Sequence, residues 1–409
     1  MLRFAFVPSG DMNLNELRLA LVNFIVSQQR NEDFLVRIDD IDKNKTVEKK
    51  DQESVGILDL FGIKYSQVVH QSQNIRFHSA MALQLLHEKK AFSCFCSDEW
   101  LQKKQEEAKA ANKPYRYDDA CRNLPAELVI DNTAPFSVRI VRPDNTSDDI
   151  DSFVILHRDK TPTHTFATAV DDMLSDISLV VRREDELRET QKEVHIRNSL
   201  GYAKTIEYVY LPDMKNADNI AVKALLEEGY LPEAILNYLI STVVTPQNEL
   251  FTLQEAIEWF SLENIITSPA SFDMQKLKEI NQKHLKKMDA RELSRFVGFA
   301  DAEIGKLAKL YADKLYTTKE LKSKIEPIFQ EREIPSAHKE PAALIQKALK
   351  DAPHFAEYET FKSYMLEKTG LQEEDFTDTF RILLTASEDD SDIAAIYACL
   401  KNYIEEIIK

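Results

Sequence analysis

The stretch that decides the fold is the amino-terminal run Arg3-Phe4-Ala5-Phe6-Val7-Pro8-Ser9-Gly10-Asp11-Met12-Asn13-Leu14-Asn15-Glu16-Leu17-Arg18. The apolar residues at its start predict a buried strand that Pro8, Ser9 and Gly10 bring to an end. Asp11 or Asn13 can cap the helix that follows. A strand that meets a helix through a Gly-containing turn often binds nucleotides, because backbone N–H groups and the positive helix end lie together there. The same pattern fits an ordinary first βα unit, and spacing alone leaves both interpretations open.

Composition limits what the rest of the chain can be. With 409 residues, 44% of them hydrophobic, the chain can bury the cores of about two to four domains. It has neither a long apolar run nor a basic-then-apolar start, so we expect no membrane span and a cytoplasmic location. Four cysteines in a chain of this length do not suggest a disulfide framework, which also favours the reducing cytoplasm. We expect a monomer.

The formal net charge of −17 is not typical of a nucleic-acid-binding protein, which must neutralise phosphates. A local basic face can coexist with an acidic total, so the charge does not exclude such a partner.

Strands alternate with helices in the first half of the chain, whereas the second half is nearly all helical. The alternation predicts an α/β fold with a parallel sheet. Within it, Phe166 to Val170 is expected to be a strand or turn, and further along the chain Pro335 to Pro341 is expected to be an internal linker. Residues 93–150 stand out as a cysteine-containing insertion, and the pattern is nearly all helical from residue 216.

The amino-terminal run resembles the signature of glutamyl-tRNA synthetases, Arg-Phe-Ala-Pro-Ser-Pro-Thr-Gly-x-x-His-Ile-Gly-His/Asn-x-Arg. The matching residues are Arg3, Phe4, Ala5, Pro8, Gly10 and Arg18. The residues that take part in the family's reaction are replaced: Val7 stands for an amino-acid-contacting Ser, Asn13 for the first His, Asn15 for Gly and Glu16 for His or Asn.

The resemblance implies a class I synthetase: a Rossmann-like catalytic domain followed by all-α junction and anticodon-binding-like domains. The catalytic domain would comprise residues 1–92 and 151–215. A zinc-knuckle and acceptor-binding-like insertion would comprise residues 93–150, the helical junction 216–289, and the anticodon-binding-like domain 290–409.

Two further blocks carry residues that the resemblance places around the amino acid. Asp39 follows the strand Phe34 to Ile38, where the family has an acidic residue that holds the substrate ammonium group. Arg182 matches the arginine that pairs with the glutamate side-chain carboxylate. His164 stands where the family has a pocket Tyr, Arg183 replaces a Gly, and Glu186 replaces a His. With Arg3, these residues give the predicted substrate-binding set Arg3, Asp39, His164 and Arg182.

The cysteines resemble the zinc knuckle of some bacterial members of the family. The predicted ligands are Cys94, Cys96, Tyr117 and Cys121. Thiolates suit tetrahedral Zn²⁺, but three Cys with one Tyr also fit three free thiols and a neighbouring Tyr. We expect Cys399 to be a small buried apolar residue.

Two loops of the family are shortened here. After Leu211-Pro212 the family has a Lys-Met-Ser-Lys loop whose lysine neutralises ATP phosphates, whereas here the loop is roughly nine residues shorter, a loss that surface loops usually tolerate. Lys215 is the basic residue left in it. The hairpin that meets the tRNA acceptor end in the family shrinks to Asp144 to Ile150.

The family reaction is the ATP- and Mg²⁺-dependent attachment of glutamate to its tRNA. Because Asn13, Asn15, Glu16 and Lys215 occupy the degraded signature positions, the first hypothesis is a copy whose aminoacylation is lost or strongly reduced. The alternatives are a working, divergent glutamate–tRNA ligase and a non-catalytic tRNA-binding or regulatory scaffold. The expected partner, from the resemblance, is tRNA-Glu.

Overall fold

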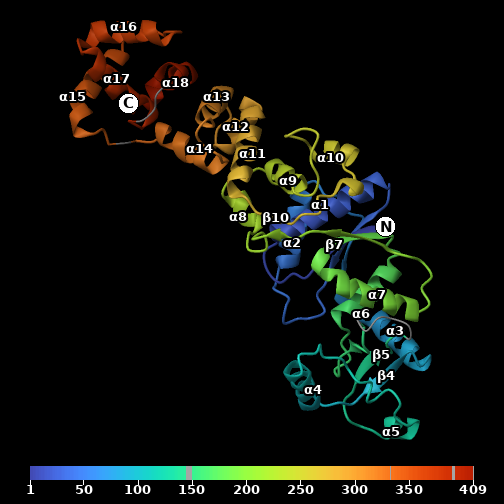
Figure 1. Cartoon of the computed structure of the whole chain (residues 1–409). Coiled ribbons are helices and arrows are strands. Elements are labelled where there is room, and N and C mark those ends of the chain that lie inside the picture. The colour runs from blue at the N-terminus through green and yellow to red at the C-terminus, as the bar shows by residue number, and fades with distance from the viewer. Residues whose placement is uncertain (144–149, 332, 389–391, 409) are drawn as a thin grey trace. The chain divides into compact units, whose positions relative to one another are not determined.

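The computed structural model describes residues 1–143, 150–331, 333–388 and 392–408 (Figure 1). The chain forms two compact units, which are described separately. The first contains Met1–Val222, Leu239–Gln247 and Thr252–Phe272, and the second contains Lys223–Tyr238, Asn248–Phe251 and Asp273–Lys409. The finer division at residues 93, 151, 216 and 290 stays a prediction. In the part of the chain described, no helix combines the length and the apolar character needed to cross a membrane.

A parallel sheet forms the centre of the first unit, in the strand order β3-β2-β1-β7-β8. The strands are β1 (Leu2–Phe6), β2 (Phe34–Ile38), β3 (Gln67–His70), β7 (Leu179–Arg183) and β8 (Glu207–Leu211). The central strands β1 and β2 are buried along almost their whole length, as expected for a sheet covered on both faces. The predicted α/β fold with a parallel sheet is confirmed.

Helices accompany this sheet in the first unit (Figure 1). They are α1 (Leu14–Gln29), α2 (Lys50–Leu60), α3 (Ile75–His87), α6 (His164–Leu174), α7 (Leu187–Ser199) and α10 (Leu253–Trp259). The most buried of them is α1, which contacts both β1 and β7. The helix α1 therefore starts at the carboxyl edge of the sheet, where open α/β folds bind ligands.

One predicted element is wrong. Residues Phe166 to Val170 were expected to form a strand or turn, but they lie inside helix α6. The Thr163 side chain caps this helix by accepting a hydrogen bond from the Phe166 N–H group. Phe166, Ala169 and Val170 are spaced to lie on one helical face and are buried together. This burial of one face stabilises a helix rather than a strand here.

A separate antiparallel sheet follows α3 in the chain. It has the order β4-β5-β6, with β4 (Ala91–Cys94), β5 (Ser137–Ile140) and β6 (Val154–Leu156). The helices α4 (Asp98–Ala110) and α5 (Ala126–Ile130) lie between its first two strands in the sequence. Most of the shortened hairpin Asp144 to Ile150 lies outside the described residues.

The second unit is helical. Its helices beyond Asp273 are α11 (Met274–Lys287), α12 (Ala290–Phe296), α13 (Ala302–Tyr311), α14 (Thr318–Ile325), α15 (Lys339–Leu349), α16 (Tyr358–Thr369), α17 (Glu373–Thr385), α18 (Ile393–Leu400) and α19 (Ile404–Ile407). The predicted linker is partly wrong, because Pro341 lies in the first turn of α15, where its missing N–H group is not needed. Cys399 is buried on α18, as expected.

The remaining short elements lie between residues 214 and 271 of the sequence. They are α8 (Val222–Glu227), α9 (Pro232–Ser241), β9 (Met214–Lys215) and β10 (Ala270–Ser271). The strands β9 and β10 pair in parallel, with Lys215 opposite Ser271. The residue left from the shortened lysine loop is thus part of a backbone ladder.

Candidate functional site

The turn after β1 is held by a capping box at the start of α1. The Asn13 side chain accepts from the Glu16 N–H group at 3.0 Å, and the Asn13 N–H group donates to Glu16 Oε2 at 2.8 Å. Of the two candidate caps, Asn13 therefore caps the helix, while the Asp11 carboxylate pairs with Lys50 at 2.7 Å. The replaced signature residues Asn13 and Glu16 thus form a capping box, in which each side chain accepts a hydrogen bond from the other residue's backbone N–H group and stabilises the start of α1.

The segment after β8 is hydrogen-bonded directly to this turn. The buried Asn15 side chain donates to Asp218 Oδ1 at 2.9 Å, to the Met214 carbonyl at 3.1 Å and to Asp213 Oδ1 at 3.3 Å. Backbone bonds add to this contact: Leu14 N–H donates to the Ile220 carbonyl, and Val222 N–H donates to the Met12 carbonyl. The shortened segment therefore lies across the turn and is bonded to it at several points.

Arg183 links the same segment to the end of β7. Its guanidinium lies 3.3 Å from Asp218 Oδ1, 3.4 Å from Asp213 Oδ1 and 3.1 Å from Asp185 Oδ2. Glu16 stands nearby; burial, followed by the nearby Asp218 charge, keeps its pKa above the ordinary value despite a hydrogen bond from Asn13. The described side chains around the turn thus include several carboxylates whose main cationic partner is Arg183.

We define the buried ion chain as Arg3, Asp172, Arg37 and Asp39. Arg3 donates to both carboxylate oxygens of Asp172, at 2.6 and 2.9 Å. Arg37 bridges Asp172 at 2.8 Å and Asp39 at 2.7 Å. Burial would raise the pKa of Asp172, but Arg3 and Arg37 lower that pKa to about 2. The predicted substrate residues Arg3 and Asp39 are thereby connected through two residues that the sequence analysis did not assign to the site.

The two terminal nitrogens of Arg182 are also bonded within the chain. Its guanidinium contacts Glu193 Oε2 at 2.9 Å, Thr190 Oγ1 at 3.0 Å and Glu186 Oε1 at 3.2 Å. These partners lie on or just before α7, directly after β7. Burial would lower the pKa of Arg182, but Glu193 and Glu186 raise it, so the guanidinium stays charged.

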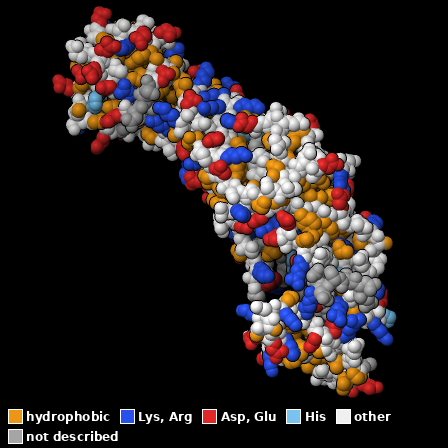
Figure 2. All heavy atoms as spheres, in the orientation of Figure 1, with side chains coloured by type: hydrophobic (Ala, Val, Ile, Leu, Met, Phe, Trp, Pro, Cys, Tyr) orange, Lys and Arg blue, Asp and Glu red, His pale blue; other side chains and the backbone are white. Residues whose placement is uncertain are grey.

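A cavity of about 1100 Å³ opens beside the predicted amino-acid residues. Val7, Asp39 and His164 line one part of it, and the His164 Nδ1 atom lies 3.7 Å from Asp39 Oδ2. The rest is lined from the loop after β2, from α4 and from the antiparallel sheet. Figure 2 shows Lys and Arg side chains beside a hollow in the region between α2 and α4 of Figure 1. The cavity lining, as far as the structure describes it, includes neither Arg182 nor the signature positions Asn13, Asn15 and Glu16.

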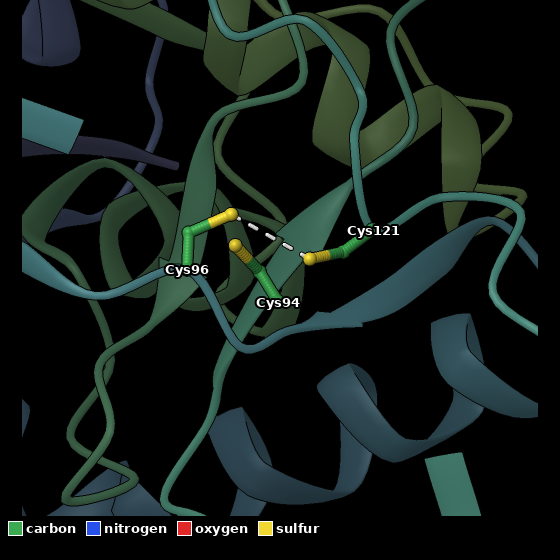
Figure 3. A group of neighbouring side chains, drawn as sticks. All are labelled: Cys94, Cys96 and Cys121. Carbon is green, nitrogen blue, oxygen red and sulfur yellow. Dashed lines mark hydrogen bonds between the residues drawn. The ribbon is translucent and has the colours of Figure 1, made fainter. Parts of the chain in front are cut away.

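The predicted metal ligands converge on one point. The Cys94, Cys96 and Cys121 sulfur atoms lie within 4.8 Å of one another and point together in Figure 3. Cys96 Sγ is 3.6 Å from Cys121 Sγ, and the Tyr117 hydroxyl is 3.4 Å from both Cys94 Sγ and Cys96 Sγ. Zinc–sulfur bonds of about 2.3 Å in a tetrahedron separate the sulfur atoms by about 3.8 Å. The donor set therefore fits a tetrahedral zinc ion.

Arg139 completes the cluster from β5. Its Nε donates to Cys94 Sγ at 3.3 Å, and its guanidinium lies over the Tyr117 ring at 3.9 Å. A cation against a sulfur atom favours the thiolate, the form that ligates a metal. The sequence analysis did not single out Arg139, although an Arg in an apolar strand is a signal of an internal charge partner.

Other residues that sequence reasoning missed are Arg37, Asp172 and Glu193. Arg37 stands inside an otherwise apolar strand, and Asp172 inside an apolar helix face. A buried charge needs a partner, so both positions carried a readable signal. Glu193, on a polar helix, carried none.

Comparison with known proteins gives the class first. The chain superimposes on a crystal structure of a glutamate tRNA ligase from Elizabethkingia meningosepticum in complex with its amino acid, with a TM-score of 0.81, 20% identity, and 99% and 97% of the two chains covered. A glutamate–tRNA synthetase from Elizabethkingia anophelis gives a TM-score of 0.78 at 21% identity, with 99% of this chain and 98% of that one covered. The fold is that of a class I aminoacyl-tRNA synthetase.

The particular family follows from the sequence. Residues 1–279 match the family model of class I tRNA synthetases for E and Q, catalytic domain. The chain is 54% identical to "Glutamate--tRNA ligase 2" of Sulfurimonas denitrificans and 42% identical to "Glutamate--tRNA ligase 1" of Nitratiruptor, with 100% of each chain covered. The chain belongs to the glutamyl-tRNA synthetase family.

Proposed function

We propose that this chain is a glutamyl-tRNA synthetase-like protein in which the ATP-dependent ligation of glutamate to tRNA is lost or strongly reduced. The observation that carries the proposal is the bonded network at the opening turn. Asn15 donates to Asp218, and Asp218 pairs with Arg183. Two residues that replace family glycines, Asn15 and Arg183, are therefore connected through Asp218. In this reading the position of the ATP phosphates is filled by the chain itself.

The chemistry explains why these replacements matter. Adenylate formation is an attack of a carboxylate on the α-phosphate of ATP, and the protein contributes position and positive charge. Removing one such donor typically costs about 10²–10³-fold in rate. Here a histidine is replaced by Asn13, and the lysine loop is reduced to a segment in which Lys215 is the basic residue. Glu16, Asp213 and Asp218 would also repel a triphosphate.

The aligned lengths of the relatives support a loss of residues from this chain. Each of the two relatives described above aligns over 432 positions, whereas this chain has 409 residues. With the whole chain covered, 23 aligned positions have no residue here, and we assign these losses to the lysine loop and the acceptor hairpin from the resemblance. Both loops contact the reacting groups in the family, so their joint shortening supports a loss of chemistry more than either alone.

The amino-acid residues are part of the proposal. We assign Arg3, Asp39, His164 and Arg182 to the pocket that holds glutamate in the family. Arg3 and Asp39 sit at the ends of the buried ion chain, which fixes their positions whether or not a ligand binds. ATP and Mg²⁺ belong to the family reaction, and we propose that this copy retains little or no use for them.

Zinc is proposed as a structural ion. Cys94, Cys96, Tyr117 and Cys121 would hold it, and the ion would fix the knuckle between β4 and α4. The support is the spacing of the four donor atoms.

The proposed partner is tRNA, with tRNA-Glu favoured by the family, and the proposed state is a cytoplasmic monomer. A retained tRNA interaction would weaken with salt, because phosphate contacts release counterions. A gel-shift titration at two salt concentrations measures this. Undetectable association at low salt would favour a scaffold without nucleic acid.

The testing experiment is glutamate-dependent exchange of pyrophosphate with ATP, with and without tRNA-Glu. We expect a rate lower than that of an ordinary family enzyme by on the order of 10⁴-fold or more, the product of two lost donors. Asn13→His with Asn15→Gly and a re-inserted lysine loop should recover activity, and the loop insertion alone is the matched control. An ordinary rate in the wild-type chain would establish the working, divergent ligase instead.

A further inference from the structure

Arg182 is a buried cation at the carboxyl end of a central parallel strand, with 7% of its surface exposed. That edge of the sheet is where α/β folds bind ligands. Arg182 presents a planar fork suited to a carboxylate. In this chain the fork meets two carboxylates of the chain itself, Glu193 and Glu186.

The two carboxylates differ in their exposure. The Glu193 side chain is 2% exposed, and it contacts Arg182 Nη1 at 2.9 Å from inside α7. The Glu186 side chain is 38% exposed, and it contacts Nη2 at 3.2 Å from the short turn Glu184–Glu186 that precedes α7. Glu193 is therefore the permanent counterion of Arg182, and Glu186 is the partner that faces solvent.

Arg182 does not need Glu186 to neutralise its charge. One carboxylate neutralises one guanidinium, and the buried Glu193 already does so. Burial would raise the pKa of Glu186, but the Arg182 charge and hydrogen bond lower that pKa below its ordinary value. Glu186 is thus ionised at neutral pH, and its charge would repel a carboxylate arriving from solution.

Glu186 also has a geometric advantage over any free ligand. Its other oxygen, Oε2, accepts from the Arg183 N–H group at 2.9 Å, which fixes the side chain toward Arg182. A tethered group competes at a high effective concentration. The Arg182 Nε atom is buried without a hydrogen-bond partner among the described residues, so the contacts of Arg182 with Glu193 and Glu186 run through its two terminal nitrogens.

We infer that Glu186 is a built-in occupant of a carboxylate-binding site at Arg182, and that removing its charge opens this site to an amino acid with a side-chain carboxylate. The inference rests on the proposed function only in assigning the amino-acid side chain to Arg182. It does not involve ATP. It makes Glu186 a specificity-determining residue, in the position where the family resemblance has a His.

Glutamate binding to the full chain, measured by calorimetry without ATP, tests this inference. Wild type should show no saturable binding of L-glutamate in the millimolar range, and Glu186→Gln should bind at least about tenfold more tightly, since like-charge repulsion is removed. L-glutamine, which has the same shape without the charge, should gain little. Asp185→Asn is the matched control, because Asp185 pairs with Arg183 and leaves Arg182 untouched.

Glu186→His is the second variant, in case the Gln variant does not fold, and it should also gain glutamate binding. Equal glutamate binding in wild type and in the folded variants would overturn the inference. An equal gain for glutamine, or an equal gain in Asp185→Asn, would also overturn it. None of these results depends on pyrophosphate exchange, so a failure here is distinguishable from a failure of the proposed loss of adenylation.

Discussion

The cysteine cluster keeps the residues that the family resemblance predicts, whereas the opening turn has lost its signature residues. At the cluster, the four predicted ligands lie at distances that fit a tetrahedral ion, with Arg139 behind them. At the turn, Asn13 and Glu16 cap a helix, and Asn15 is bonded to the segment after β8. The comparison teaches that similarity of fold, with a TM-score of 0.81, says little about each separate site.

The largest effect is expected at the cluster. Cys121→Ser should reduce bound zinc from about one equivalent to well below it, since structural zinc contributes about 10–16 kcal/mol in small domains. Metal analysis and hydrogen exchange over residues 91–121 measure the change. Cys399→Ser is the matched control, because Cys399 lies buried on α18 in the second unit. If zinc content is unchanged in Cys121→Ser, the cluster is a set of free thiols.

The second-largest effect is expected at the buried ion chain. It tests whether the predicted amino-acid residues Arg3 and Asp39 are held in place, as the ligands of the cysteine cluster are. Asp172→Asn should lower the free energy of unfolding by about 3–5 kcal/mol, because it leaves the buried Arg3 without its carboxylate partner and Arg37 with Asp39 alone. Because the folded pKa of Asp172 is lowered to about 2, its contribution is present above pH 3.8 and is lost as pH falls toward 2. Denaturant titrations at several pH values measure both effects.

The control for this experiment is Asp176→Asn. Asp176 pairs with Lys204 at the surface, so its loss should change the free energy of unfolding very little. If Asp172→Asn costs no more than this control, the ion chain does not hold Arg3 and Asp39 in place.

The smallest effect is expected at the turn, from Glu16→Gln. Glu16 has a raised folded pKa, so the folded state binds more protons and this residue makes stability fall as pH rises from about 4.5. Gln keeps the capping box and removes that dependence, with a change below about 1 kcal/mol. Glu88→Gln should shift the slope the opposite way, because the Lys90 hydrogen bond lowers the pKa of Glu88. An unchanged slope in Glu16→Gln would mean that Glu16 is not buried at the turn.

Much of the fold was readable from the sequence because its signals are local. Apolar strands, the break at Pro8 to Gly10 and the cap at Asn13 each depend on a few neighbouring residues. The error at Phe166 to Val170 arose where apolar residues fit both a strand and a helix face, and the Thr163 cap decided between them. The four predicted zinc ligands came from the resemblance of the cysteine spacing to a zinc knuckle, and their convergence depends on Cys121 folding back from a loop.

The partners of the site residues could not be predicted in the same way. Arg37 meets Asp172 across a sequence separation of 135 residues, and Asn15 meets Asp218 across 203 residues. Such pairs depend on how strands and helices pack, and a single sequence gives no pairing information. The sequence did show which signature residues were replaced, but only the structure shows that the replacements bond to one another.

The central claim is that the chain itself fills the nucleotide position at the opening turn. Equilibrium dialysis of labelled ATP with Mg²⁺ against the wild-type chain tests it most directly, with the Asn13→His, Asn15→Gly and loop-restored chain in parallel. The account predicts no saturable ATP binding to the wild type through the millimolar range and measurable binding to the restored chain. Micromolar ATP binding to the wild type would contradict it.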